Sequence, residues 1–315
     1  MRTAKYIGKR LLSLLIVLLG VSIIAFALGK ASPGDPAEEI LRKQGVEFPT
    51  DEQLEEVREK LGFHDPVIVQ YIEWLKEALH GNLGTSLLTR RDVLPEIIRR
   101  IPMTLRLSVL ALGFTVFFGI GFGILMALNR KGALDHVLRI LSILLLSIPG
   151  FWLALFLIFL FSEKWHLLPT SGYNGWKSLL MPAFVLSSST LGVTARLTRS
   201  SLIKELGEAY ILTANAKGLT RPKVILRHAF QNSLVPIITL LGNYFGGILG
   251  GSAIIESIFA LPGLGNYVLA GIEGRDYYVV QGYVLFSGII YVGITLIIDL
   301  LYLLINPKIR RGETQ

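Results

Sequence analysis

The chain of 315 residues holds 31 Lys and Arg against 23 Asp and Glu, a formal net charge of +8, and it has no cysteine. Apolar residues make up 52% of the chain and the mean hydropathy is +0.56, which is typical of a membrane protein. The composition excludes disulfides and thiolate metal sites, and the five scattered histidines predict no resident metal or other cofactor. Basic residues lie at the ends of apolar runs rather than along one stripe, so the charge indicates membrane topology and no nucleic-acid partner.

Residues 1–30 predict the first transmembrane helix. Arg2, Lys5, Lys9 and Arg10 precede an uncharged apolar run at residues 11–29. A secretory signal peptide is the alternative, but its apolar core is about 7–15 residues long, whereas this run matches the roughly 20 residues that cross a bilayer. The basic start predicts a cytoplasmic N-terminus.

Residues 31–102 form the one long soluble insertion that the sequence predicts. Nine Lys and Arg stand against fourteen Asp and Glu here, an acidic balance that favours the extracytoplasmic side. Thr50 and Gln53 predict a capping box that opens a helix, Gly62 can close that helix, and Asp65 precedes the start of another. The insertion is either a small helical cap that packs on the spans through Trp74 or a platform for an extracellular solute-binding protein.

Residues 103–315 predict a core of five further transmembrane helices. Apolar runs long enough to span occur at residues 102–128, 134–161, 179–197, 234–255 and 282–305. Together with the first helix they make six spans, an even number that returns the C-terminus to the cytoplasmic side. We therefore predict an all-α polytopic protein with a small helical extracytoplasmic insertion between helices 1 and 2.

Polar residues, glycines and prolines in and beside these spans are candidates for a solute pathway or gate. Pro149 predicts a bend at mid-depth of the third span, which either lines a pathway or serves packing alone. Hydroxyl groups give the fourth span a polar centre that faces either a cavity or carbonyls of its own helix. Gly242, Gly246 and Gly250 predict close packing of the fifth span against a second membrane subunit. The candidate pathway or gate residues are Pro149, Ser187, Ser188, Thr190, Asn243, Glu256, Pro262 and Gly263.

The longest basic interruption between two apolar spans, residues 207–236, is here named the coupling segment. Basic loops between spans stay in the cytoplasm. Gly218 can end one short helix, Thr220 can cap the next, and Pro222 fits the first turn of that helix. The apolar side chains of Val224, Ile225 and Phe230, ringed by Lys223 and Arg227, predict insertion into a cleft on a soluble partner. The alternatives are an amphipathic helix lying on lipid headgroups and a linker that only sets topology.

The coupling segment resembles the cytoplasmic loop of the membrane subunits of ABC importers. That loop usually contains Glu-Ala-Ala, three residues and Gly; Thr213, Ala214 and Gly218 keep the spacing, while Leu212 stands in place of the glutamate. In the branch for peptides and nickel the loop looks more like Tyr-x-x-Thr-Ala-x-Ala-Lys-Gly-Leu followed by Arg-His-Ala, Asn and Pro. Residues that match are Tyr210, Thr213, Ala214, Ala216, Lys217, Gly218, Leu219, Arg227, His228, Ala229, Asn232 and Pro236. The resemblance implies ATPase coupling by Tyr210, Thr213, Ala214, Lys217, Gly218, Arg227, His228, Asn232 and Pro236.

The resemblance extends over nearly the whole chain and implies the type I ABC importer permease fold, with a coupling loop at residues 204–233. It also implies the partners: a second homologous permease subunit, one or two ATPase subunits, an extracytoplasmic solute-binding protein and membrane lipid. The location implied is the cytoplasmic (inner) membrane of a bacterium or archaeon.

Motifs outside the coupling segment look closest to permeases for nickel and metal-chelating metallophores. Two motifs are similar to those of this branch: Pro-Gly-Leu-Gly at residues 262–265 and Arg-Asp-Tyr-Tyr-Val-Val-Gln at residues 275–281. The second motif of the branch usually has a proline at the position of Tyr278. Nickel carried as a chelate is the expected solute, and di- or oligopeptides are the alternative, since peptide permeases share several of these motifs. The other motifs are Gly34-Asp35-Pro36-Ala37, Ile40-Leu41, Gln44-Gly45, Gly62-Phe63, Asp65-Pro66, Gln70-Tyr71, Trp74-Leu75, Gly84-Thr85-Ser86 and Leu168-Pro169-Thr170-Ser171-Gly172.

The sequence contains no phosphate-binding loop and no hydrolase or metalloprotease motif, so we expect a permease subunit and no enzyme, with ATP hydrolysis in separate subunits. An ion-coupled secondary transporter is one alternative, for which Asp299 near the inner end of the sixth span is a lone candidate acid. A membrane-embedded structural partner is the other.

Overall fold

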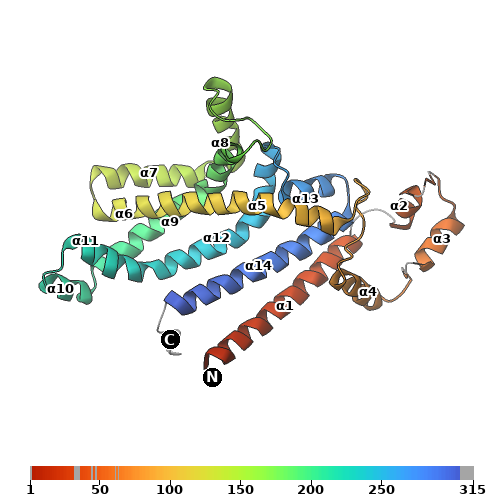
Figure 1. Ribbon diagram of the computed structural model, residues 1–315, viewed down its shortest axis with the longest axis horizontal. Coiled ribbons are helices and arrows are strands. Elements are labelled where there is room, and N and C mark those ends of the chain that lie inside the picture. Colours follow the sequence, from red (N-terminus) through yellow and green to blue (C-terminus); the bar gives the residue numbers. More distant parts are fainter. Residues whose placement is uncertain are drawn as a thin grey trace. The chain divides into compact units, whose positions relative to one another are not determined.

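The structure is a computed structural model that describes residues 2–31, 36–43, 45–46, 48–60, 62 and 64–305. Within these ranges it is mostly helical, without a β-strand, and it confirms the all-α prediction. The elements shown in Figure 1 are α1 (Arg2–Ala31), α2 (Pro36–Lys43), α3 (Asp51–Lys60), α4 (Val67–Leu79), α5 (Val93–Phe114), η1 (Thr115–Ile120), α6 (Gly121–Leu128), α7 (Ala133–Ser147), α8 (Gly150–Leu157), η2 (Ile158–Lys164), η3 (Trp176–Leu179), α9 (Leu180–Leu206), α10 (Ala209–Ala216), α11 (Arg221–Val224), η4 (Ile225–Ala229), α12 (Phe230–Ile258), α13 (Leu264–Glu273) and α14 (Tyr277–Ile305).

Helices long and apolar enough to cross a membrane account for the predicted spans. Among the described residues there are five such segments: Leu12–Lys30, Val93–Leu128, Trp176–Leu206, Pro222–Ile248 and Tyr277–Ile298. The bent pair Ala133–Ser147 and Gly150–Lys164 makes a sixth span if it is counted as one. Every predicted apolar run therefore coincides with a span-length helix or with this pair. The basic residues Lys308, Arg310 and Arg311 after the last span lie outside the described residues.

The third predicted span is broken rather than gently bent. The two helices of the pair meet at 105°, far more than the expected kink. Ile148 is extended, with ψ 124°, because the ring of the following proline disfavours the helical conformation. Pro149 then precedes α8, where its missing N–H costs no helical hydrogen bond.

The chain divides into two compact units, which we describe separately. The first unit comprises Met103–Gly265 with Met1–Lys5 and Gly293–Gln315, and the second comprises Tyr6–Pro102 with Asn266–Val292. The second compact unit thus contains the insertion together with most of α1, most of α13 and the start of α14. The sequence-based division, by contrast, followed predicted membrane topology along the chain.

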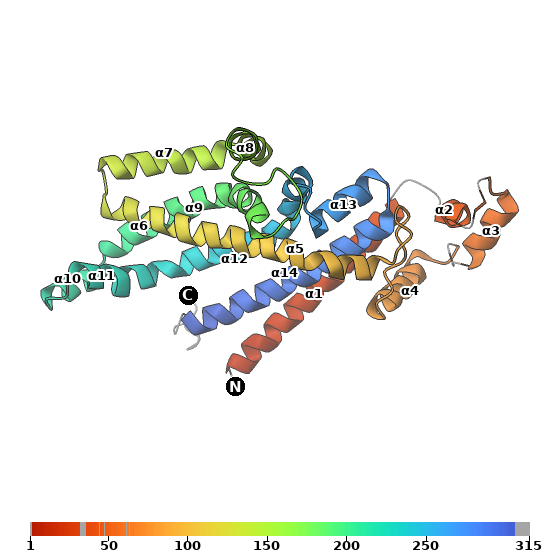
Figure 2. The ribbon, with the colours of Figure 1, turned by 45° about the horizontal axis from the view of Figure 1, so that its top comes forward.

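The first unit is built around α9, which packs against α6, α7, α8 and α12 (Figure 2). Its small residues allow the close approach. A Cβ added at Gly192 would lie 2.3 Å from the carbonyl oxygen of Ser142 in α7, and one at Gly123 in α6 would lie 2.4 Å from Cβ of Thr198. Of the glycines predicted to face a second subunit, Gly242 packs within this chain, because a Cβ at Gly242 would meet Ile298 at 2.6 Å. Small residues thus seat helices of one subunit against each other.

In the second unit, α4 packs on α1 through aromatic side chains. The ring of Phe26 lies 5.5 Å from that of Tyr71 and 5.8 Å from that of Trp74, and the hydroxyls of Ser22 and Tyr71 are 2.7 Å apart. Contact between these half-buried rings favours the interpretation of α4 as a helical cap on the first span.

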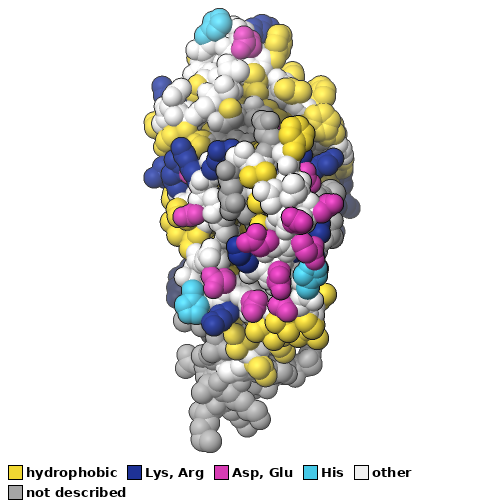
Figure 3. All heavy atoms as spheres, turned by 90° about the vertical axis from the view of Figure 1, so that its right-hand side faces the viewer, with side chains coloured by type: hydrophobic (Ala, Val, Ile, Leu, Met, Phe, Trp, Pro, Cys, Tyr) yellow, Lys and Arg dark blue, Asp and Glu magenta, His cyan; other side chains and the backbone are white. Residues whose placement is uncertain are grey.

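The helix boundaries in the insertion follow the predicted signals, and its surface is acidic. The Thr50 amide donates to the Gln53 side chain at 3.0 Å and the Gln53 amide to the Thr50 hydroxyl at 3.4 Å, which confirms the capping box before α3. Gly62 has φ +64° just after α3 ends. The first turn of α3 carries Asp51 and Glu52. Figure 3 shows several acidic side chains, in magenta, close together on this face of the molecule.

Candidate functional site

The coupling segment folds into two short helices and a helical turn that leads into α12 (Figure 1). α10 ends at Ala216 with Lys217 as its cap residue, and Gly218 follows with φ +74°, the left-handed conformation that glycine adopts without steric cost. The Gly218 amide donates to the carbonyl of Asn215 at 2.9 Å, and the Val224 amide donates to the carbonyl of Thr220 at 3.0 Å. The predicted helix stop at Gly218 and the restart after Thr220 are therefore both present.

The inner face of the coupling segment is held by an apolar cluster within the first unit. Buried side chains of α10, α11 and η4 pack there with Leu202 of α9 and Ala127 of α6. The cluster members from the coupling segment are Ile211, Ala214, Val224 and Ala229, with Leu219 and Phe230 partly buried against them. This cluster fixes the position of the coupling segment on the ends of α6 and α9.

The structure corrects the prediction that Val224 and Ile225 project toward a partner. Val224 is only 2% exposed and Ile225 is also buried, because the helix turns this face toward α9. The apolar side chains that do project are Leu212, 71% exposed, and Leu226, 59% exposed. Leu212, the residue that departs from the importer loop pattern, is thus one of the exposed apolar residues of the segment. Leu226 was missed because a short helix without a clear apolar period does not reveal which face is covered.

Tyr210 braces the coupling segment from its other side. Its hydroxyl donates to Glu205 Oε2 at the end of α9 at 2.5 Å, and Asn232 at the start of α12 also interacts with it. Burial, followed by the hydrogen bond to Glu205, raises the pKa of Tyr210, so the hydroxyl remains a donor at neutral pH. Tyr210 and Asn232, two of the predicted coupling residues, therefore lie together.

The remaining predicted coupling residues are mostly on the surface of the coupling segment. Thr213, Lys217, Arg227 and Pro236 are exposed, His228 is half-buried, and Ala214 belongs to the buried cluster. The outer surface thus combines cations with Leu212 and Leu226. A charged rim around exposed leucines is a surface that suits a soluble partner.

The predicted pathway residues do not form one group. Ser187 and Ser188 donate to the carbonyls of Phe184 and Val185, each at 2.8 Å, which fits the alternative in which hydroxyls bond their own helix. Thr190 is buried in α9, whereas Asn243 on α12 and Pro149 at the α7–α8 break are exposed.

Glu256 and Gly263 do come together, at the end of α12. Glu256 is 0% exposed, and its Oε1 accepts a hydrogen bond of 2.7 Å from the hydroxyl of Thr104 in α5. The same hydroxyl accepts from the amide of Leu264 at 2.9 Å, and a Cβ at Gly263 would lie 2.3 Å from Glu256 Oε2. Pro262 lies in this turn but is exposed. Thr104 was missed, because a lone threonine in an apolar run carries no signal of a partner 152 residues away.

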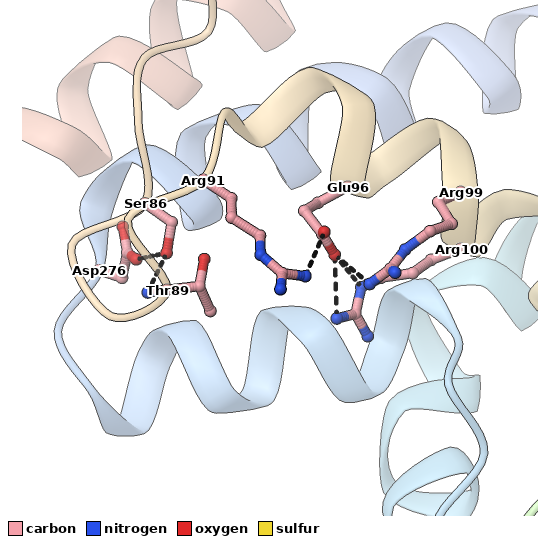
Figure 4. A network of polar contacts seen from close by, with 7 residues as sticks. All are labelled: Ser86, Thr89, Arg91, Glu96, Arg99, Arg100 and Asp276. Atoms are coloured by element: carbon pink, nitrogen blue, oxygen red, sulfur yellow. Dashed lines mark hydrogen bonds and ion pairs between the residues drawn. The ribbon is translucent and has the colours of Figure 1, made fainter.

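The second unit contains a polar network that joins two of the family-like motifs (Figure 4). Ser86 donates to Asp276 Oδ2 at 2.6 Å, the Leu88 amide donates to the same oxygen at 3.2 Å, and the Val279 amide donates to Asp276 Oδ1 at 3.3 Å. Asp276 therefore caps α14 and holds the loop before α5 at the same time. Tyr278, which replaces the usual proline, lies over Gly84, where a Cβ would be 2.4 Å from its ring.

Beside it, Glu96 gathers three arginines. Arg99 donates to Glu96 at 2.7 Å, Arg100 at 3.2 Å and Arg91 at 3.4 Å (Figure 4). The Arg100 guanidinium also lies 4.5 Å from the ring centre of Tyr267, and burial, together with the nearby Asp276 and Glu96 charges, raises the pKa of Tyr267 to about 12. The charge of Glu96 is thus paired with arginines within the unit.

No described residues form a cluster of three or more His, Asp or Glu side chains suited to a metal ion.

Comparison with known proteins agrees with this geometry. Residues 119–311 match the family model described as the inner membrane component of binding-protein-dependent transport systems, and residues 3–108 match the model of its N-terminal part. A relative from Brucella abortus (strain 2308), provisionally named a peptide transport system permease protein, is 38% identical over 96% of this chain and 98% of its own length. The glutathione transport system permease protein GsiC of Shigella flexneri serotype 5b (strain 8401) is 37% identical over 97% of this chain and 98% of its own.

A likeness to a solved structure supports the fold. The inward-facing MetNI methionine ABC transporter superposes with a TM-score of 0.57 at 18% identity, covering 67% of this chain and 96% of that one. The family match covers more than half of the chain and the relatives match nearly end to end. The chain therefore belongs to the inner membrane component family of binding-protein-dependent transport systems and is a permease subunit of an ABC importer, not itself an enzyme.

Proposed function

We propose that this permease imports short peptides delivered by an extracytoplasmic binding protein, together with a second permease subunit and separate ATPase subunits. The observation that carries the choice of solute is the naming of the end-to-end relatives, one for peptides and one for glutathione, which is itself a tripeptide. The nickel chelate, our first expectation from short motifs, has no counterpart among these names. Peptide import, the alternative, therefore becomes the main proposal.

The coupling segment is proposed to receive force from the ATPase subunits on the cytoplasmic side. Two features support this role. Its inner face is fixed to α6 and α9 by a buried cluster, so a push on the segment moves these helices as a body. Its outer face offers Leu212 and Leu226 within a rim of cations, which suits a cleft that excludes water.

The link from Thr104 to Glu256 and Leu264 is proposed as part of the gate. It joins α5, the end of α12 and the start of α13 through two hydrogen bonds to one hydroxyl. If these elements separate in the transport cycle, the bonds break together and Glu256 gains access to water, which favours two discrete states.

The solute can be tested with the complete importer reconstituted in vesicles with its binding protein and ATPases. ATP-dependent uptake of a labelled tripeptide should be saturable and reduced by excess unlabelled dipeptide or glutathione, while a nickel–histidine chelate leaves it unchanged. If the nickel chelate were taken up and peptides did not compete with it, the nickel interpretation would be restored. Uptake that survives ATP depletion and collapses with the ion gradient would instead favour a secondary transporter.

A further inference from the structure

Two adjoining recesses lie where the turn from α6 to α7 meets the C-terminal half of α9, all within the first unit. Their volumes are about 390 and 440 Å³, and they share Arg139, Arg199 and Ser200. We name their combined surface the basic groove. Five cations line it, namely Arg130, Lys131, Arg139, Arg196 and Arg199. The family comparison and the coupling segment leave this groove without a role.

The charge of the basic groove is not neutralised from within. Asp135 is the single acid among its lining residues, and it is 1% exposed. Arg199 grips it with two hydrogen bonds of 2.7 and 2.8 Å, and the Lys131 amide donates a third of 3.0 Å. Arg130, Arg139 and Arg196 are exposed and make no ion pair with any residue that the structure describes. The groove therefore keeps an excess of positive charge. The ion pair between Asp135 and Arg199 holds the start of α7 to α9.

The groove continues into an apolar surface along α7. Ile143 lines the second recess beside Arg139 and Arg196, and it lies one helical turn after Arg139 on the same side of the helix. Val137 and Ile140 are also exposed on α7. Cationic side chains thus lie next to exposed apolar side chains of a span. This combination suits an amphiphile with an anionic head and hydrocarbon chains.

We propose that the basic groove binds the phosphate headgroup of an anionic phospholipid, with the acyl chains along the exposed face of α7. Basic pockets at helix ends attract such headgroups with about 1 kcal/mol per Lys or Arg. A free phosphate ion would use the same cations but would leave Ile143 and Ile140 without a partner. The lipid uses both halves of the surface, so the observations favour it over the ion.

The test compares the full chain with the variant Arg139→Gln/Arg196→Gln, which keeps the Asp135–Arg199 pair. The matched control is Arg42→Gln/Lys60→Gln, which removes two exposed charges from the insertion. Retention of dioleoylphosphatidylglycerol and of dioleoylphosphatidylcholine is measured by native mass spectrometry from detergent, with and without inorganic phosphate. The wild type and the control should prefer the anionic lipid, and the groove variant should bind it roughly 30-fold more weakly, the effect of two lost charges.

Four results would overturn the proposal. Equal binding of the two lipids by the wild type would remove the headgroup requirement, and unchanged binding by the groove variant would place the lipid elsewhere. If millimolar inorganic phosphate displaced the lipid, and the acyl chains added nothing to the affinity, the groove would be a binding site for an ion. A loss of lipid when the ATPase and second permease subunits are bound would assign the groove to a subunit interface. The midpoint temperature of thermal unfolding is also measured, and an equal midpoint for the groove variant and the wild type shows that the fold is intact.

Discussion

The coupling segment and the polar network around Asp276 use the same kinds of residues in opposite ways. In the coupling segment the apolar anchors point inward to α6 and α9, while Leu212, Leu226 and the cations point outward. In the network the charged groups point toward one another, so that Asp276 is 0% exposed and Glu96 holds three arginines. The first region exposes apolar and cationic side chains, whereas in the second the carboxylates of Asp276 and Glu96 are paired within their own chain.

We propose that the first region is a surface for binding and that the second is a lock for stability. Substitutions in the network should lower stability first and transport only as a result. Substitutions on the outer face of the coupling segment should spare stability and reduce coupling to ATP hydrolysis. The four predictions below test this separation.

The largest effect is expected from Asp276→Ala. The change removes the acceptor of three hydrogen bonds in a fully buried place, leaving the Ser86 hydroxyl and two amides unpaired. We expect a loss of about 3 kcal/mol in the free energy of unfolding, measured on the detergent-solubilised protein. The control Glu273→Ala, an exposed acid of α13, should change it by less than about 0.5 kcal/mol. Equal stability of the two variants would show that the network is no lock.

Leu212→Asp combined with Leu226→Asp should separate binding from stability. Both side chains are exposed, so unfolding should stay within about 0.5 kcal/mol of the wild type. Affinity for the ATPase subunits should fall by about 2 kcal/mol, or roughly 30-fold, as measured by co-purification at graded subunit concentrations. The control Leu79→Asp places the same charge on an 80% exposed leucine of α4 and should leave the affinity unchanged. An intact complex with the double variant would remove the docking role of this face.

Gly218→Val tests whether the turn of the coupling segment sets its geometry. The added side chain meets no atom within 4 Å, so the penalty comes from φ +74° alone, about 1–2 kcal/mol. We expect ATP hydrolysis that drives less peptide uptake per ATP. Gly218→Asn is the control, since asparagine tolerates this conformation, and it should recover most of the coupling ratio. A normal ratio in the valine variant would favour the interpretation of the segment as a topology linker.

The smallest effect is expected from Tyr210→Phe. The variant loses the hydrogen bond to Glu205 but keeps the ring, on a side chain that is 36% exposed. A cost of about 1 kcal/mol is expected, seen as a few-fold lower coupling ratio with an unchanged apolar cluster. Tyr173→Phe, at a similarly exposed tyrosine outside the coupling segment, should have no effect. A loss as large as that of the double leucine variant would mean that Tyr210 itself contacts the partner.

Local signals predicted much of the helical layout. The spans follow from uninterrupted apolar runs, the start of α3 from Thr50 and Gln53, and the end of α10 from Gly218. Pro149 predicted a change of direction, but the size of the break depends on what packs against α7 and α8. The exposed face of α11 and η4 was predicted wrongly, since Val224 and Ile225 are covered by helices that are distant in the sequence.

The sequence by itself determined where the apolar spans lie, several helix caps and the resemblance to importer permeases, because these depend on residues within a few turns of each other. Only the tertiary structure decided which leucines of the coupling segment are exposed, that Ser86 meets Asp276 across 190 residues, and that Thr104 reaches Glu256. The physical reason is that burial and hydrogen-bond partners are set by which helix faces come together. Periodicity in one short helix does not say which face its neighbours will cover.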